Sequence, residues 1–203
     1  MRNRLIESIA IWVTAVTVAA VVGTALPAMA AEGDGTWGVV QLMSDLGQVR
    51  RSQAHFTERK YLKVLKSPRQ SSGTLTYTAP DKLEKRTLRP RPEVLVIDGK
   101  ALTVETGGKR HTLKLQDYPV LWAFVESIRA TLGGDIATLE RFYKVDLEGG
   151  PARWQLFLAP RERSMSRVIS QIRIGGAGSR IELIEVQEAK GDRSVMKVVE
   201  DAP

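Results

Sequence analysis

The chain has 203 residues, a formal net charge of +7 and no cysteine. That length suits a single domain, and without cysteine the fold depends on side-chain packing rather than on disulfides. The positive charge favours anionic partners such as lipid headgroups, an acidic protein surface or nucleic acid. Nucleic acid is excluded, because no stretch interleaves aromatic residues with Lys and Arg as base-stacking sites do.

Residues 1–30 have the features of a cleaved signal peptide. Two arginines precede an almost unbroken apolar run over residues 9–26, and Ala28 and Ala30 are the small residues that a signal peptidase recognises. An uncleaved anchor is the alternative, since roughly 18 apolar residues can span a bilayer. We expect cleavage after Ala30, which leaves an exported, soluble domain over residues 31–203 with a net charge of about +6, because two Arg and one Glu are removed.

An amphipathic helix is predicted over residues 36–52. Thr36 suits the N-cap position, and a stripe of apolar residues follows at helical spacing. The stripe consists of Val39, Leu42, Met43, Leu46 and Val49.

Alternation with period two then predicts two groups of strands. The first group covers residues 55–65, 72–79, 82–89, 93–98, 101–107 and 109–115, and the second covers 141–149, 152–160, 168–176, 179–189 and 193–200. Asp98-Gly99 is the strongest hairpin signal in the chain, because both turn positions accept a positive φ. Gly107-Gly108 predicts the next hairpin.

Two helices are predicted between the strand groups, over residues 117–134 and 135–141. The first has an apolar stripe and stops at Gly133-Gly134. The stripe consists of Val120, Leu121, Phe124, Val125 and Ile128.

Because successive strands are close neighbours in the sequence, the sheet should be antiparallel and meandering. The predicted fold is therefore mainly β with helices, of the α+β class. It is an unclosed antiparallel β-barrel of about 10 to 11 strands, with an N-terminal helix and a helical insertion that covers the open side as a lid.

The chain contains no recognisable catalytic or metal-binding motif. His55 and His111 each lie between polar neighbours on predicted strands, without a second ligand at metal-binding spacing. A nucleophile elbow, an H-E-x-x-H motif and a P-loop are all missing. The basic loop over residues 161–167 either touches an anionic surface or is simply solvated. We therefore expect no enzyme activity, no cofactor and no metal.

A series of short motifs follows the leading helix in a fixed order. It consists of Phe56-Thr57-Glu58, then Gly73, Leu75, Pro80 and Leu83, a charged strand, Pro92, and residues 95–102 with Asp98-Gly99-Lys100. Over residues 36–200 this order resembles the LolA-type outer-membrane lipoprotein carriers of Gram-negative bacteria, whose pattern is a leading helix, F-T-Q/E, G-x-L-x-x-x-x-P-x-x-L/F, a charged strand, a proline and L-V-x-D-G-K-x-L. The later strands resemble the family more loosely.

Two departures from the family pattern bear on cargo handover. The lipoprotein carriers usually have an Arg immediately before the proline of the second hairpin, and this chain has Ala79 there. The C-terminal extension of the best-known members is also missing, since the sequence stops at Pro203, soon after the last predicted strand. From these differences we expect a divergent branch of the family, with a cargo that is either a lipoprotein or another lipid.

The resemblance implies a monomeric periplasmic carrier, a chaperone that binds acyl chains of lipoproteins or lipids in a hydrophobic cavity and moves them toward the outer membrane. It also implies an inner-membrane donor and an outer-membrane acceptor. The alternative is a lipid- or lipoprotein-sensing accessory protein of an inner-membrane partner on the same fold. The predicted cavity residues are Phe56, Leu75, Tyr77, Leu83, Leu95, Trp122, Phe124, Val125 and Trp154. For each of them, ordinary core packing is the alternative.

Overall fold

The structure is a computed structural model that describes residues 37–201. The predicted signal peptide over residues 1–30 and the predicted N-cap Thr36 lie outside the described residues.

Eleven antiparallel strands form one curled sheet, in the spatial order β6-β5-β4-β3-β2-β1-β11-β10-β9-β8-β7. The first half consists of β1 (Arg51–Tyr61), β2 (Arg69–Thr78), β3 (Lys82–Arg89), β4 (Glu93–Asp98), β5 (Ala101–Thr106) and β6 (Lys109–Lys114). The second half consists of β7 (Tyr143–Gly150), β8 (Arg153–Pro160), β9 (Ile169–Ala177), β10 (Arg180–Glu188) and β11 (Arg193–Glu200). The halves meet where β1 pairs with β11, and β6 and β7 are the two edges.

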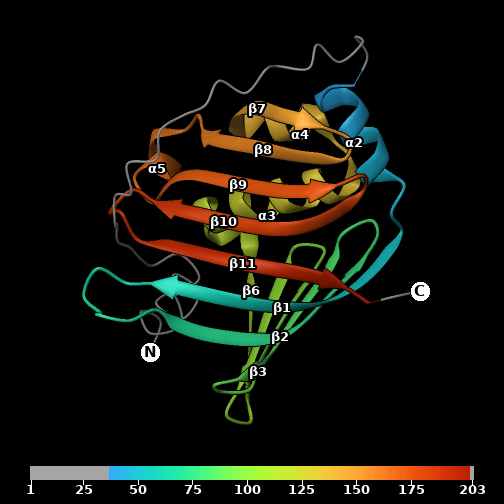
Figure 1. The fold of residues 1–203 in the computed structure, drawn as a ribbon. Coiled ribbons are helices and arrows are strands. Elements are labelled where there is room, and N and C mark those ends of the chain that lie inside the picture. The colour runs from blue at the N-terminus through green and yellow to red at the C-terminus, as the bar shows by residue number, and fades with distance from the viewer. Residues whose placement is uncertain (1–36, 202–203) are drawn as a thin grey trace.

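The helices lie against the concave face of this sheet. They are α2 (Val39–Gly47), α3 (Pro119–Gly133), α4 (Ile136–Phe142) and the short α5 (Arg163–Ser166), with a 3₁₀ turn η2 (Leu115–Asp117). Figure 1 shows α3 and α4 behind strands β7 to β11, with the chain leading into them from β6. The connection from one sheet edge to the other therefore crosses the open side of the barrel.

Local sequence explains where α3 begins and ends. Pro119 occupies its first turn, where a missing N–H has no consequence, and Gly134 ends it in the left-handed conformation with φ +71°. Gly134 also lies against α2, because a Cβ there would be 2.2 Å from the carbonyl oxygen of Met43. Asp135 then caps α4, with its carboxylate accepting a hydrogen bond from the backbone N–H of Thr138 at 2.9 Å.

The main hydrophobic core lies between the helices and strands β7 to β10. Its largest members are Trp154 and Tyr143, and the same cluster contains Leu42 of α2 and Met165 of α5. Smaller clusters lie under β4 and β5 and along β1 and β11. The largest of these clusters thus packs against the second half of the sheet.

The predicted fold class is confirmed, and β3, β4 and β11 have the predicted bounds. Three details differ. The first helix ends at Gly47, so Val49 lies beyond it, and β1 begins at Arg51 rather than at residue 55. The expected basic loop over residues 161–167 contains the helix α5, because Met165 is buried in the core.

Candidate functional site: a cavity beneath helix α3

A cavity of about 590 Å³ lies between the concave face of the sheet and helix α3. Its walls come from β2, β3, β4 and β5 on one side and from β10 and β11 on the other, and β1 lies between them. Most of the lining side chains are aliphatic or aromatic. This volume lies within the range of typical ligand sites, which are likewise mostly apolar with a few polar groups.

Helix α3 contributes one continuous apolar stripe to the cavity. Side chains spaced three or four residues apart lie on the same side of a helix, so the predicted stripe faces the sheet as a unit. Its lining residues are Val120, Leu121, Phe124, Val125, Ile128 and Leu132. Leu46, from the last turn of α2, lines the cavity beside them.

Six of the nine predicted cavity residues are brought together on the lining. They come from β2, β3, β4 and α3, and they are Leu75, Tyr77, Leu83, Leu95, Phe124 and Val125. Tyr77 and Leu83 are directly paired across β2 and β3. Leu75, Leu83 and Leu95 of the family motif therefore lie around one apolar space, and their contact with a ligand stays a prediction.

The other three predicted residues are large aromatics that do not belong to the lining. Phe56 is buried on β1, where the ammonium of Lys85 lies 4.7 Å from its ring centroid. Trp154 is packed in the main core, and its Nε1–H donates to the carbonyl of Gly178 at 2.9 Å. Trp122 is packed against the cluster under β4 and β5.

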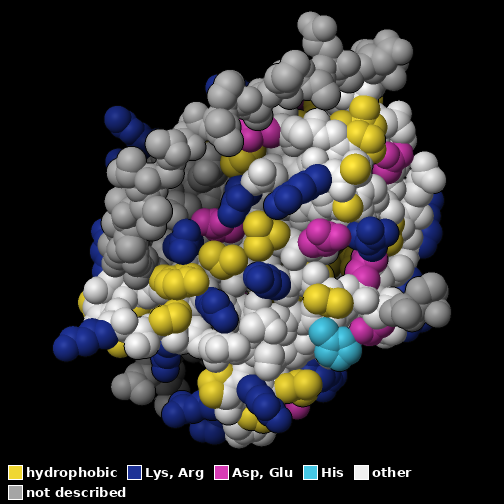
Figure 2. Space-filling model, viewed as in Figure 1, with side chains coloured by type: hydrophobic (Ala, Val, Ile, Leu, Met, Phe, Trp, Pro, Cys, Tyr) yellow, Lys and Arg dark blue, Asp and Glu magenta, His cyan; other side chains and the backbone are white. Residues whose placement is uncertain are grey.

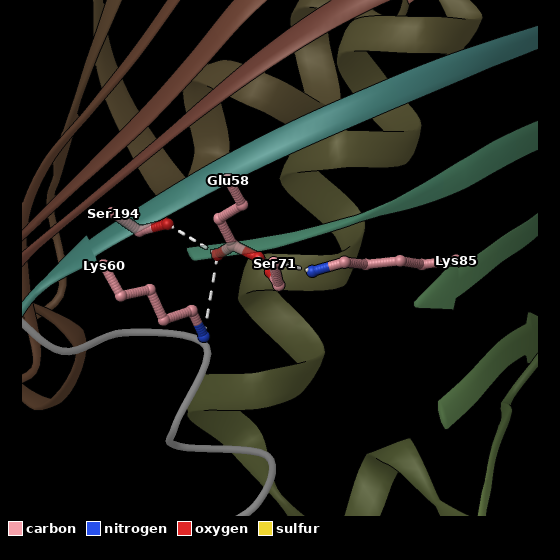
Figure 3. A network of polar contacts seen from close by, with 5 residues as sticks. All are labelled: Glu58, Lys60, Ser71, Lys85 and Ser194. Carbon is pink, nitrogen blue, oxygen red and sulfur yellow. Dashed lines mark hydrogen bonds and ion pairs between the residues drawn. The ribbon is translucent and has the colours of Figure 1, made fainter. Parts of the chain in front are cut away.

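A buried polar cluster interrupts the apolar lining, and the sequence analysis did not foresee it. The carboxylate of Glu58 accepts hydrogen bonds from Lys85 at 2.7 Å, from Ser194 at 2.6 Å and from Ser71 at 3.3 Å. The ammonium of Lys60 lies 3.6 Å from the same carboxylate. Figure 3 shows these side chains converging from β1, β2, β3 and β11. Glu58, Lys85 and Ser194 also line the cavity.

Burial and the neighbouring charges both shift the pKa values of the groups in this cluster. Burial raises the pKa of Glu58, but the positive charges of Lys85 and Lys60 and the hydrogen bonds from Lys85 and Ser194 outweigh it and lower that pKa to about 2. Burial lowers the pKa of Lys85, and it lowers the pKa of Lys60 to about 8, while Glu58 opposes both shifts. At neutral pH the cluster therefore contains an ionised carboxylate, which the side chains of Lys85, Lys60 and Ser194 contact.

The polar cluster extends along the same end of the strands to Glu188 at the end of β10. Glu188 is buried, and its Oε1 has no hydrogen-bond partner among residues 37–201. Burial, and secondarily the charge of Asp192, raise the pKa of Glu188 to about 8, although Lys60 acts in the opposite direction. Glu188 is therefore mainly protonated at neutral pH.

Arg129 anchors α3 over the cavity at the opposite end of the strands. One guanidinium nitrogen, Nη2, donates to the carbonyl of Asp81 at 2.8 Å and to the carbonyl of Gly99 at 2.6 Å. The other, Nη1, pairs with Glu126 at 3.1 Å. One side chain of the helix thus bonds the backbone of both the β2–β3 turn and the β4–β5 turn.

The remaining candidate residues do not form a second site. His55 and His111 are exposed, and Nδ1 of His55 lies 2.6 Å from Asp201. Across residues 37–201 there is no group of three or more metal-binding side chains placed to hold a metal ion. Within the same range, no helix has the length and apolar character needed to cross a bilayer.

Comparison with solved structures finds proteins with distant similarity to this chain. A LolA superfamily protein, NE2245 from Nitrosomonas europaea, superposes with a TM-score of 0.44 at 12% identity, over 81% of this chain and 93% of that one. A chain of the Pseudomonas aeruginosa MucA/MucB complex gives 0.45 at 14% identity, over 80% and 55%. A putative outer membrane lipoprotein-sorting protein domain from Vibrio parahaemolyticus gives 0.42 at 8% identity, over 81% and 91%.

No curated protein sequence matches the chain significantly. The family model described as outer membrane lipoprotein carrier protein LolA-like matches residues 30–200, which is nearly the whole of the chain. That match spans all the elements that build the cavity. The chain belongs to the LolA-like family of outer membrane lipoprotein carrier proteins.

Proposed function

We propose that the protein is a periplasmic carrier that binds the acyl chains of a lipoprotein or another lipid and moves them toward the outer membrane. The observation that carries this proposal is the cavity of about 590 Å³, whose lining is mostly aliphatic and aromatic. Family membership supports the same class of function. The role is binding and transfer rather than catalysis.

Partition of acyl chains into this cavity provides the binding energy. Each methylene group transferred from water to an apolar site contributes about 0.8 kcal/mol. A long acyl chain therefore binds tightly without any specific hydrogen bond, and discrimination among cargoes depends on volume and on the polar group that follows the chain. The Glu58 cluster gives the cavity a direction, because the polar part of a cargo is better placed at that end than against the apolar stripe of α3.

Release requires α3 to move, because this helix covers the apolar space. In the family pattern an arginine on the second hairpin is associated with closure, and this chain has Ala79 in its place. Here the arginine is on the helix instead of the hairpin, since Arg129 of α3 donates hydrogen bonds to the turn carbonyls of Asp81 and Gly99. We propose that Arg129 holds the closed position and that its release accompanies handover.

Native mass spectrometry of the protein purified from periplasm, with lipid extraction of the same sample, tests the carrier proposal. Co-purifying acylated species are expected, and their masses distinguish a lipoprotein from a phospholipid. Leu83→Trp should fill the cavity and reduce uptake of a fluorescent fatty acid at least several-fold. Val199→Trp adds the same bulk to an exposed position and should leave uptake unchanged. A cargo-free mass together with no fatty-acid uptake by the unmodified protein would refute the proposal.

The alternative, a sensing accessory of an inner-membrane partner, predicts a different outcome from the same protein. It requires a stable complex with a membrane protein and slow or absent transfer of the bound lipid between donor and acceptor vesicles. Rapid transfer of a fluorescent lipid, with no stable complex in solubilised inner membranes, supports the carrier.

A further inference from the structure

One end of the sheet carries a strongly basic rim, which we define as five loops with some of the strand residues beside them, over residues 62–69, 89–92, 107–110, 161–168 and 189–193. In an antiparallel meander every second turn lies at the same end of the strands, so these five loops lie together at one end of the barrel. Contacts confirm that neighbouring loops touch. The backbone N–H of Lys63 donates to Asp192 at 3.3 Å, and the N–H of Ala189 donates to the carbonyl of Val168 at 3.0 Å.

The rim holds twelve Lys and Arg side chains but only two carboxylates, Glu162 and Asp192. The basic residues are Lys63, Lys66, Arg69, Arg89, Arg91, Lys109, Arg110, Arg161, Arg163, Arg167, Lys190 and Arg193. Loops at the opposite end carry both signs, including the carboxylates of Asp81, Asp98 and Asp201. Figure 2 shows dark blue side chains along the lower left edge, the side on which the β1–β2 hairpin of Figure 1 ends.

Exposed apolar side chains gather on the same rim. Val64 and Leu65, at the tip of the β1–β2 hairpin, are 88% and 43% exposed, with Lys63 and Lys66 on either side. Val168 adds a third exposed apolar group, so three of the six exposed large hydrophobic residues within residues 37–201 lie on the rim. Leu88, near the end of β3, is a fourth and lies directly beside it. Large apolar side chains at loop tips among cations are typical of surfaces that enter a headgroup layer.

We propose that this basic rim docks on an anionic lipid bilayer, with Val64 and Leu65 entering the interface and the Lys and Arg side chains contacting lipid phosphates. The exposed apolar groups are few and form no compact patch, because Val64 and Leu65 share one loop tip while Val168 lies on another loop. That arrangement suits a planar headgroup layer better than the compact apolar centre of a protein interface. Val168 both belongs to the rim and lines the cavity. Docking by this rim therefore places the polar end of the cavity next to the headgroups.

Flotation of the purified protein with vesicles tests the docking. We expect binding to vesicles of phosphatidylglycerol and phosphatidylethanolamine, little binding to pure phosphatidylcholine, and a steep loss of binding as salt is raised. The double variant Lys63→Glu/Lys66→Glu should weaken binding at least about ten-fold. Lys82→Glu/Lys100→Glu makes the same change in net charge at the opposite end and should weaken it far less.

The apolar contribution has its own control. Val64→Ser/Leu65→Ser should weaken vesicle binding several-fold, whereas Val199→Ser, at a position 67% exposed on β11, should leave it unchanged. In Val64→Trp the added indole should shift its emission to the blue on anionic vesicles and be quenched by brominated acyl chains. These exposed positions should tolerate substitution, which unchanged thermal unfolding would show.

Equal losses from the variants at the two ends, or an emission of Val64→Trp that is unaffected by vesicles, would overturn the proposal. If Lys63→Glu/Lys66→Glu retains vesicle binding but loses binding to a defined acidic protein domain, the rim is a docking surface for a protein partner instead. The docking does not depend on what the cavity holds, so a protein that docks but takes up no fatty acid would overturn the carrier proposal alone.

Discussion

Glu58→Gln tests whether the buried cluster stabilises the fold through its charge. The variant keeps the shape of the side chain and removes the ionised carboxylate that Lys85, Lys60 and Ser194 contact. The pKa of Glu58 is about 2 in the folded protein against an ordinary value of 4.5. At about 1.4 kcal/mol for each pH unit, that difference corresponds to about 3 kcal/mol of unfolding free energy at neutral pH.

The sign of the pH dependence follows from the lowered pKa. A carboxylate whose pKa is lower in the folded state contributes its full stabilisation above about pH 4.5 and loses it as the pH falls toward about 2. Urea unfolding followed by tryptophan fluorescence should therefore give a difference of about 3 kcal/mol between the unmodified protein and Glu58→Gln at pH 7. That difference should shrink steadily between about pH 5 and pH 3.

Glu185→Gln is the matched control, because Glu185 is paired with Arg173 and Arg193 in a more exposed position on β10. Partly exposed ion pairs contribute about 1 kcal/mol or less. A Glu58→Gln variant as stable as Glu185→Gln at pH 7, or a Glu58→Gln difference as large at pH 3 as at pH 7, would refute the reasoning.

Three further predictions concern the helices and the cavity end, and urea unfolding measures each of them. Gly134→Ala should destabilise the protein by about 2 to 4 kcal/mol, because it adds a Cβ at positive φ against the backbone of α2. Gly108 has a similar φ but open space around it, so Gly108→Ala should lower the free energy of unfolding by only about 1 kcal/mol. Equal losses of stability in the two variants would contradict the close contact at Gly134. Arg129→Met should lower stability by about 1 to 3 kcal/mol and speed hydrogen exchange in α3, and unchanged exchange would show that the turn contacts do not hold the helix. Glu188→Gln should become more stable than the unmodified protein as pH rises from about 5 to 8, because the raised pKa means that deprotonation destabilises the folded state; parallel pH profiles would exclude that role.

Most of the fold could be predicted because its signals are local. Alternation with period two predicts the strands, and Asp98-Gly99 and Gly107-Gly108 define hairpins whose glycines have positive φ in the structure. The first helix was predicted too long, since Val49 continues the apolar spacing although the helix ends at Gly47. Sequence spacing alone does not show where a helix gives way to the strand that follows.

The polar cluster could have been found from the same alternation. Glu58 follows Phe56 by two residues and Lys85 follows Leu83 by two, so both charged side chains share the inward face of their strands. Charged residues on a strand are usually solvated, and for that reason Glu58 and Lys85 were not predicted to be buried. The position of Trp154 had no comparable signal, because inward-facing aromatics on β8 and β2 look alike in sequence. Only tertiary packing, which places Trp154 in one core cluster with Leu42 of α2 and Leu139 of α4, decides which of them meets the open space.

The two sheet edges, β6 and β7, give the molecule a mechanical property. In a closed barrel the strand number and the stagger fix the diameter, so enlarging the interior breaks ladder hydrogen bonds. Here the linear strand order leaves no ladder between β6 and β7, and the covalent link that crosses the gap contains α3 and α4. The interior can therefore widen by displacement of helices while every strand pairing stays intact. In the proposed carrier, such compliance would accommodate acyl chains of different number and length, with the main resistance coming from side-chain contacts along one helix.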